Sequence, residues 1–254
     1  MNSLFSLYQK YNYGGDKMII INGKVYGKNV TIINGRIVND EKADCKNNID
    51  ETKIVNGNVK DIFVQSGIAN INIIPTEKDS IAAHLYGNCE SSKSLPKLNI
   101  RESIQKSVMI DIVFERSTMF TGFITLDIEL PIKSYDNITV SSNTADISID
   151  KDIKCNSLQI KTMSGDAKVY TSCADITINI MSGDIDLDLD AKEVTSIKLK
   201  TMSGDIDLKL NNVTKVNLST TTMSGDIKNK FDGIKDGFIV TTDISTMSGD
   251  IKIR

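Results

Sequence analysis

The sequence contains little of what enzymes and zinc sites are commonly built from. Its 254 residues include one histidine, His84, three prolines and no tryptophan. The four cysteines are Cys45, Cys89, Cys155 and Cys173, and no two of them form a Cys-x-x-Cys pair. Zinc sites of the usual kinds combine several cysteine and histidine ligands, so the sequence predicts none. A single histidine also restricts acid–base and nucleophilic catalysis, and we interpret it as a structural residue.

Motifs of catalysis and of nucleotide binding are missing as well. No Gly-x-Ser-x-Gly, phosphate-binding loop or Gly-x-Gly-x-x-Gly motif occurs. We therefore predict that the protein is not an enzyme and that it has no catalytic, cofactor-binding or metal-binding residues. Thirty basic and 33 acidic residues leave a net charge of −3, which argues against a nucleic-acid partner.

Signals for membrane insertion and secretion are absent too. No run of about 18 apolar residues exists, so we expect no transmembrane segment. The first residues, MNSLFSLYQKYNYGG, have neither a basic n-region nor a long apolar h-region, and they do not predict a secretory signal. The default expectation is a cytoplasmic protein, with association with the cell envelope as the alternative.

What the sequence does contain is a repeat. The tetrapeptide Met-Ser-Gly-Asp occurs five times, and a weaker copy, Thr-Ala-Asp-Ile, begins at residue 144. The five copies begin at Met163, Met181, Met202, Met223 and Met247. Such recurrence at the length of one coil is typical of solenoid proteins.

Each repeat has a strand–turn–strand pattern. Apolar and polar residues alternate before the tetrapeptide and again after it, and a period of two indicates half-buried strands. Ser-Gly-Asp between them indicates a turn, in which glycine allows a positive φ. Because isoleucine recurs at positions 147, 185, 206, 227 and 251, like residues should stack on like residues about 4.8 Å apart.

These patterns predict an all-β protein, a single-stranded β-solenoid with right-handed crossovers. Regular coils are expected from about residue 140 to 254. Residues 1–57 are expected to form a less regular, turn-rich β cap and residues 58–254 the repeat domain. Within this division, the polar residues 40–53 are predicted to be a loop.

Three columns of equivalent side chains have competing interpretations. We expect the methionines to fill the core, and the alternative is a track for soft metals such as copper(I). We expect the aspartates at 146, 166, 184, 205, 226 and 250 to bond turn amides, and the alternative is a calcium ladder. Cys155 and Cys173 occupy equivalent positions within disulfide range. We expect free, stacked thiols there, because a cytoplasmic location disfavours the bond.

The order of these segments resembles the bacterial putative-adhesin β-strand-repeat family, domain of unknown function 4097, from about residue 59 onward. The resemblance rests on SGIANINIIP (66–75), DSIAAHL (79–85), LDIELP (126–131), YDNITV (135–140) and the Ser-Gly-Asp-Ile coils. It implies a β-solenoid without established chemistry, in proteins of the cell surface and of envelope stress. The segment INGKVYGKNV (21–30) also resembles the turn-rich coils of bactofilins.

The function that we predict is a non-catalytic scaffold that presents a repetitive β-surface to a protein or cell-envelope partner. One alternative is a cytoplasmic regulator of envelope stress, and another is a polysaccharide-acting enzyme built on a β-helix. The sequence stops at IKIR (251–254), within the fifth coil. We expect this uncapped coil to allow self-association, because the end of a solenoid carries unpaired backbone groups.

Overall fold

Every element of the computed structural model is a β-strand, which confirms the predicted all-β class. The structure describes residues 8–13, 16–21, 24–26, 30–33, 36–39, 47–91, 94–114, 120–190, 192, 194–212, 215–231 and 239–254. No helix long and apolar enough to cross a membrane is found among these residues.

The chain divides into two compact units, Met1–Asn47 and Asn48–Arg254. In the first unit, an antiparallel sheet contains β1 (Tyr8–Tyr13), β2 (Asp16–Ile21) and β3 (Lys24–Tyr26), and a hairpin contains β4 (Val30–Ile33) and β5 (Arg36–Asn39). The division falls before the boundary expected at residues 57 and 58. Residues 47–53, predicted to be part of a loop, instead begin strand β6 (Asn47–Asn56) of the second unit.

The second unit contains two sheets. In spatial order, the first sheet contains β6, β9 (Ser80–Ser91), β12 (Phe120–Pro131), β8 (Asn70–Thr76), β14 (Ile147–Ile149), the start of β16 (Ala167–Ser182), β17 (Ile185–Asp190), β19 (Ile206–Asn211), β23 (Ile251–Ile253) and β21 (Ile227–Asn229). The second sheet contains, in the same sense, β10 (Lys97–Ser103), β11 (Ser107–Val113), β7 (Asp61–Ser66), β13 (Ser134–Ser142), β15 (Lys154–Ser164), the rest of β16, β18 (Ser196–Ser203), β22 (Ile239–Ser248) and β20 (Lys215–Ser224).

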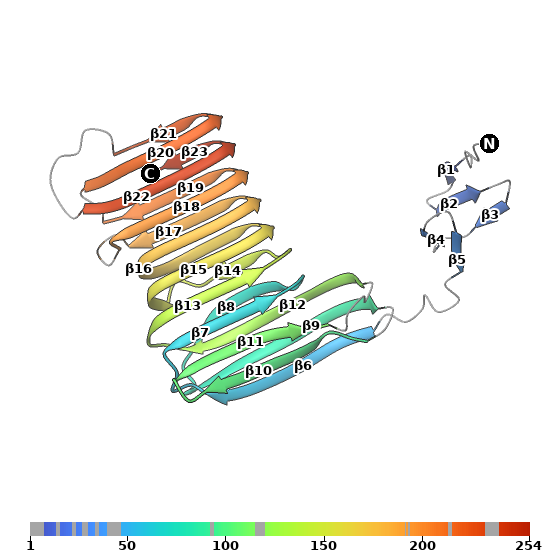
Figure 1. Ribbon diagram of the computed structural model, residues 1–254, viewed down its shortest axis with the longest axis horizontal. Helices are drawn as coiled ribbons and strands as arrows, with labels where there is room; N and C mark the ends of the chain where they lie inside the picture. The colour runs from blue at the N-terminus through green and yellow to red at the C-terminus, as the bar shows by residue number, and fades with distance from the viewer. Residues whose placement is uncertain are drawn as a thin grey trace. The chain divides into compact units, whose positions relative to one another are not determined.

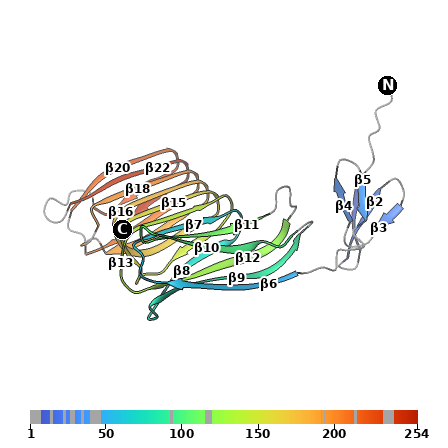
Figure 2. The same ribbon diagram turned by 60° about the horizontal axis from the view of Figure 1, so that its bottom comes forward.

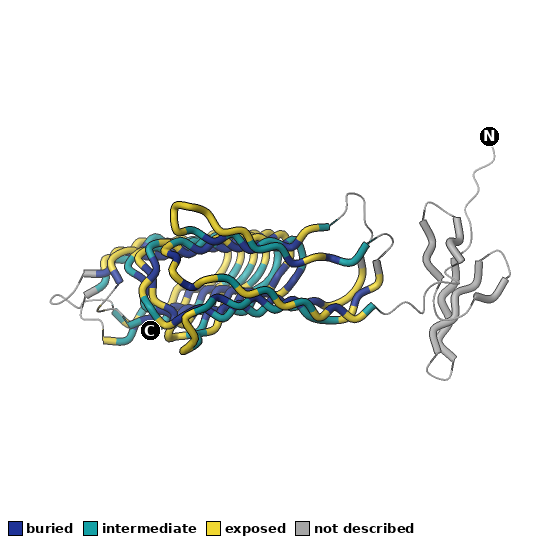
Figure 3. Tube along the Cα trace, turned by 90° about the horizontal axis from the view of Figure 1, so that it is seen from below, coloured by how far each residue is buried: buried dark blue, intermediate teal, exposed yellow. Residues whose placement is uncertain are grey.

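One coil consists of a strand from the second sheet, a corner, and a strand from the first sheet. From β7 and β8 onward, the strands of successive coils pair in parallel. Figure 2 shows the layer with β18, β20 and β22 above the layer with β6, β8 and β9. Figure 3 looks along the stack, and buried positions alternate with more exposed ones along each strand. This is the predicted single-stranded solenoid.

The order of the coils in space differs from their order in the sequence. Strand β18 pairs with β22, and β22 pairs with β20 on its other side. In the first sheet, β23 likewise lies between β19 and β21. Figure 1 shows β22 between β18 and β20. The last sixteen residues therefore form an internal coil, and the coil of β20 and β21 ends the stack.

This order corrects the expected position of the free end. Ile251 and Ile253 are 0% and 1% exposed, and Ile227, one coil further out, is 43% exposed. The C-terminal coil is thus covered on both sides and is not the uncapped end on which the expected self-association was based. The unpaired strand edges at this end of the stack belong to β20 and β21.

The opposite end of the stack is closed by side chains. The backbone N–H of Leu98 in β10 donates to Glu51 Oε2 of β6 over 2.8 Å, and Lys53 Nζ donates to the carbonyl oxygen of Leu98 over 2.5 Å. Side chains that occupy backbone groups in this way protect a strand edge from pairing with another chain.

The core is a set of stacked apolar columns. Ile185, Ile206 and Ile251 face one another in register from β17, β19 and β23, and all are at most 1% exposed. Ala167 occupies the same column, as does Ile147. The predicted isoleucine column is therefore confirmed.

Candidate functional site

The Ser-Gly-Asp corners are shaped by a close approach between coils. Gly183 has a φ of 145°, and a Cβ atom added to it would lie 2.2 Å from the carbonyl oxygen of Gly165. No L-residue fits there, because both the backbone conformation and the contact exclude a side chain. The N–H of Gly183 donates to the carbonyl oxygen of Ser203 over 2.9 Å. The corners thus stack through the backbone, and the serines belong to a repeated turn.

The aspartates form a ladder along these corners. The backbone N–H of each aspartate donates to the side-chain oxygen of the ladder residue in the neighbouring coil, over 2.8–3.1 Å. In spatial order the ladder contains Asn70, Asp146, Asp166, Asp184, Asp205, Asp250 and Asp226. The prediction of bonds to backbone amides is confirmed, with the difference that each amide belongs to the next coil. The ladder joins neighbouring coils and independently gives the same coil order as the strand pairing.

The methionines do not fill the core, so the prediction that they would was wrong. Met181, Met202 and Met247 are each 48% exposed, Met163 is 56% exposed and Met223 is 77% exposed. Each follows an inward residue of its strand, such as Thr201 before Met202. Successive side chains of a strand point to opposite faces. The methionine side chains therefore form a column on the outside of the solenoid.

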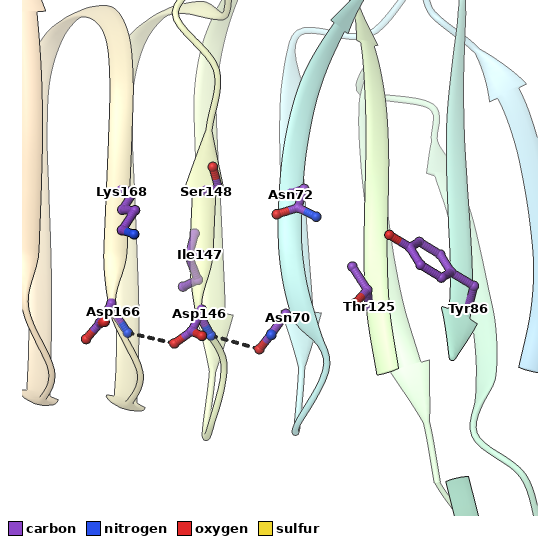
Figure 4. Close-up of a pocket in the computed structure, with 9 residues that line it drawn as sticks. All are labelled: Asn70, Asn72, Tyr86, Thr125, Asp146, Ile147, Ser148, Asp166 and Lys168. Carbon is purple, nitrogen blue, oxygen red and sulfur yellow. Dashed lines mark hydrogen bonds between the residues drawn. The ribbon is translucent and has the colours of Figure 1, made fainter. Parts of the chain in front are cut away.

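Two hollows lie beside the aspartate ladder on the first sheet. The one in Figure 4 has a volume of about 230 Å³ and is lined by residues of β8, β9, β12, β14 and β16, including Asn72, Tyr86 and Lys168. Burial, and then the charge of Asp127, raise the pKa of Tyr86. The lining combines one cation, two ladder carboxylates and several amides and hydroxyls, so it can bind a polar group.

The second hollow, of about 290 Å³, is strongly acidic. Its lining includes the carboxylates of Asp166, Asp184, Asp186, Asp205 and Asp207. The cation among the lining residues is Lys168. Within the described ranges, no three His, Cys, Asp or Glu residues are grouped so that they could hold a metal ion.

Several charges on the outside of the first sheet pair with one another. Lys209 Nζ lies 2.6 Å from Asp188 Oδ2, and Asp207 accepts bonds from Lys252 and Arg254 over 3.2 and 3.0 Å. Burial works to raise the pKa of Asp207, but the bonds from the two cations outweigh it and hold that pKa below its usual value. This face is therefore an ionic ladder that joins β17, β19 and β23.

His84 occupies a structural position on β9. Its Nε2 atom lies 2.8 Å from Asp50 Oδ1 of β6, and its ring stacks on Tyr86 with the ring centroids 4.7 Å apart. The register places it opposite Asp127 of β12. The contact with Asp50 joins β6 to β9, which agrees with the structural role expected from the sequence.

Cys155 and Cys173 are bonded in a disulfide between adjacent coils, with 4.8 Å between their Cα atoms. The expectation of free, stacked thiols was therefore wrong, although the equivalence of the two positions was correctly predicted. Cys89 is a buried free cysteine, and burial raises the pKa of its thiol. Cys45 lies outside the described residues.

Comparison with known proteins identifies the family. A family model described as Toastrack DUF4097 matches residues 59–254. Because this match covers well over half of the sequence, the chain belongs to the Toastrack family. No curated protein matches the chain.

Two solved structures illustrate the similarity. A protein described as a putative cell adhesion protein from Clostridium sporogenes is 13% identical, with a TM-score of 0.45, and the match covers 82% of this chain and 99% of that one. A structure described as a putative adhesin from Bacteroides fragilis is 14% identical, with a TM-score of 0.42 and coverage of 80% and 97%.

Proposed function

We propose that this member of the Toastrack family is a non-catalytic interaction scaffold, which presents the outward face of its second sheet to a partner on the cell envelope. The observation that carries the proposal is the strict register of this face. Equivalent outward residues of β13, β15, β16, β18, β22 and β20 are paired directly. An array with one row per coil suits an extended or repetitive partner, since the rows follow one another at a regular spacing.

The chemistry of this face favours hydrogen bonding. Most of the outward residues carry hydroxyl or amide groups. They form three columns: Asn137, Ser157, Asp175, Ser196, Thr241 and Asn217; Thr139, Gln159, Thr177, Lys198, Asp243 and Ser219; and Ser141, Lys161, Asn179, Lys200, Ser245 and Thr221. Groups of this kind can both donate and accept, so they suit polar polymers and extended peptide segments.

The outward face of the first sheet is less suited to this role. Several of its charges are engaged within the protein in short ion pairs, such as Lys209–Asp188 at 2.6 Å and Lys252–Asp207 at 3.2 Å. A partner on that face would have to displace these ion pairs and desolvate their charges. The outward columns of the second sheet carry fewer charges, and the ion pairs of Lys198 and Lys200 with Asp243 are longer, at 3.9 and 3.8 Å.

The disulfide supports a location on the envelope. Such bonds persist in oxidising compartments and are rare in the cytosol. Cys155 and Cys173 join two coils within the regular part of the solenoid, where the bond holds their strands in register. An oxidising environment is therefore part of the proposal, in place of the cytoplasmic default.

Cosedimentation with isolated cell envelopes tests the proposal. Thr177→Arg places a long cation in the middle of the second sheet's outward face. Ser148→Arg places the same side chain on the first sheet, at a position that is likewise half-buried and outward. We expect Thr177→Arg to reduce binding at least tenfold and Ser148→Arg to leave it unchanged.

Two results would contradict the proposal. Equal loss of binding in both variants would show that the second sheet is not the binding face. Release of soluble sugar from the envelope fraction by the wild-type protein would show that the protein is catalytic. Circular dichroism of both variants checks that each remains folded.

A further inference from the structure

The outward methionine column is not required by the fold. Residue 143 occupies the same column one coil before Met163, and it is an exposed asparagine. A polar side chain is thus accepted at this position of the corner. The next five coils nonetheless all place methionine there, with between 48% and 77% of each residue exposed to solvent. Burial in the core therefore does not explain the methionines, and the thioether is the group that distinguishes them from Asn143.

The spacing of the column matches the geometry of a soft metal ion. The Cα atoms of equivalent residues in adjacent coils are 4.8 Å apart, as measured at Cys155 and Cys173. Zinc–cysteine bonds are about 2.3 Å long, and bonds of about this length would place two thioethers on opposite sides of one ion about 4.6 Å apart. Soft ions such as copper(I) select thioether ligands. Three rotatable bonds let neighbouring methionine side chains adjust to this distance.

We propose that the column binds soft monovalent cations of the copper(I) and silver(I) class, each ion bridging two methionines of adjacent coils. Met163, Met181, Met202, Met247 and Met223 follow one another in this order along the stack. The column contains four such adjacent pairs. If each thioether binds one ion, the five methionines bind two bridging ions at saturation.

The surroundings favour a metal over a protein partner. Two residues before Met202 lies Lys200, and three residues after it lies Asp205, both exposed. At the first of these positions the other coils have Lys161, Asn179, Ser245 and Thr221. The apolar stripe is therefore one residue wide with polar residues on both sides. Docking surfaces for proteins have a broader apolar centre.

Silver(I) is a suitable probe because it needs no reducing agent and leaves the disulfide oxidised. The protein carries Cys45→Ser and Cys89→Ala, so that free thiols do not bind the ion, and the buffer contains nitrate in place of chloride. The wild-type column is compared by calorimetric titration with a variant in which all five methionines are leucine. Leucine has a similar size, and circular dichroism verifies folding.

A matched pair of variants tests the bridging geometry. One keeps Met163 and Met181, which lie in adjacent coils, and the other keeps Met163 and Met202, which are separated by a coil. The remaining column positions are leucine in both, so each variant has two thioethers in the column. We expect the adjacent pair to bind silver(I) at least about tenfold more tightly, because its second thioether is held next to the first.

The expected result for the whole column is two silver ions per chain, lost in the five-leucine variant. The proposal is overturned if the five-leucine variant binds as much silver as the wild-type column. It is also overturned if the two matched variants bind equally, since the thioethers would then act independently. Neither result depends on the proposed envelope partner, because the titration contains none.

Discussion

The internal position of the C-terminal coil predicts which of two equivalent isoleucines contributes more to the stability of the protein. Ile206, Ile251 and Ile227 form one column, in which Ile251 lies between the other two. If the coils followed the order of the sequence, Ile227 would be internal and Ile251 would be at the end. Replacing each with alanine therefore distinguishes the two arrangements by the sign of a difference.

The magnitudes follow from burial. Ile251 is 0% exposed, and truncating a fully buried isoleucine to alanine typically costs about 2–5 kcal/mol, since a cavity remains. Ile227 is already 43% exposed, and no coil covers it from outside. Its truncation loses part of the usual transfer free energy and leaves little enclosed cavity. We expect about 1 kcal/mol for Ile227→Ala.

Urea denaturation followed by circular dichroism gives the free energies of unfolding, provided that the m-values agree. Hydrogen exchange of the amides in β20 and β21 shows whether Ile227→Ala merely frays the end coil, as expected for a solenoid. A larger loss of stability for Ile227→Ala than for Ile251→Ala would refute the inserted coil. Equal losses would refute the exposure of Ile227 at the end of the stack.

Four further predictions use other parts of the molecule. Gly183→Ala should lower the free energy of unfolding, measured by urea denaturation, by at least about 2 kcal/mol, because the added Cβ would overlap a carbonyl oxygen. Gly67→Ala is the control and should be tolerated, since the nearest atom to its added Cβ is 3.8 Å away. Ser142→Ala should leave stability unchanged or raise it by up to about 1 kcal/mol, because its buried Oγ has no partner among the described residues; a marked loss of stability would contradict this. Asp207→Asn should lower stability by up to about 1 kcal/mol at pH 7. The pKa of Asp207 is depressed in the folded protein. Its contribution to stability is therefore fully present above the pKa of the unfolded state and is lost as the pH falls through the pKa of the folded state. The urea midpoints of the variant and the wild type should accordingly converge in acid. Thiol titration of the denatured, unreduced protein should find two reactive thiols among the four cysteines, and four would refute the disulfide.

The solenoid itself was predictable because its signals are local and repeated. Period-two alternation gives the strands, and the turn residues give the corners. The direction of the methionines was also encoded in the sequence. Ile197, Leu199 and Thr201 are all inward, so strand parity places Met202 outside. The apolar character of methionine favours the core, but strand parity decides the direction of its side chain.

Other features depend on contacts that no local pattern encodes. Residues 47–53 are rich in polar side chains, which favours a loop, but β6 lies at the end of the first sheet and pairs with β9. Edge strands need only one apolar face and commonly carry charges. The equivalent positions of Cys155 and Cys173 make a disulfide possible, but whether it forms also depends on the redox state of the compartment, which the sequence does not encode.

The order of the coils was encoded in the inward residues rather than in the repeat motif. In the coil of β20 and β21, Thr220 pairs with Ile244, and Asn229 pairs with Ile253. Threonine is accepted at inward positions between two coils, as Thr242 at 2% exposure shows, but an asparagine in place of Ile253, which is 1% exposed, would be costly. At the end of the stack Asn229 is only half-buried. All coils share nearly the same corner, so the coil of β20 and β21 or the coil of β22 and β23 could stack on the coil of β18 and β19. The coil of β22 and β23 has the more apolar inward residues, and it takes the internal place.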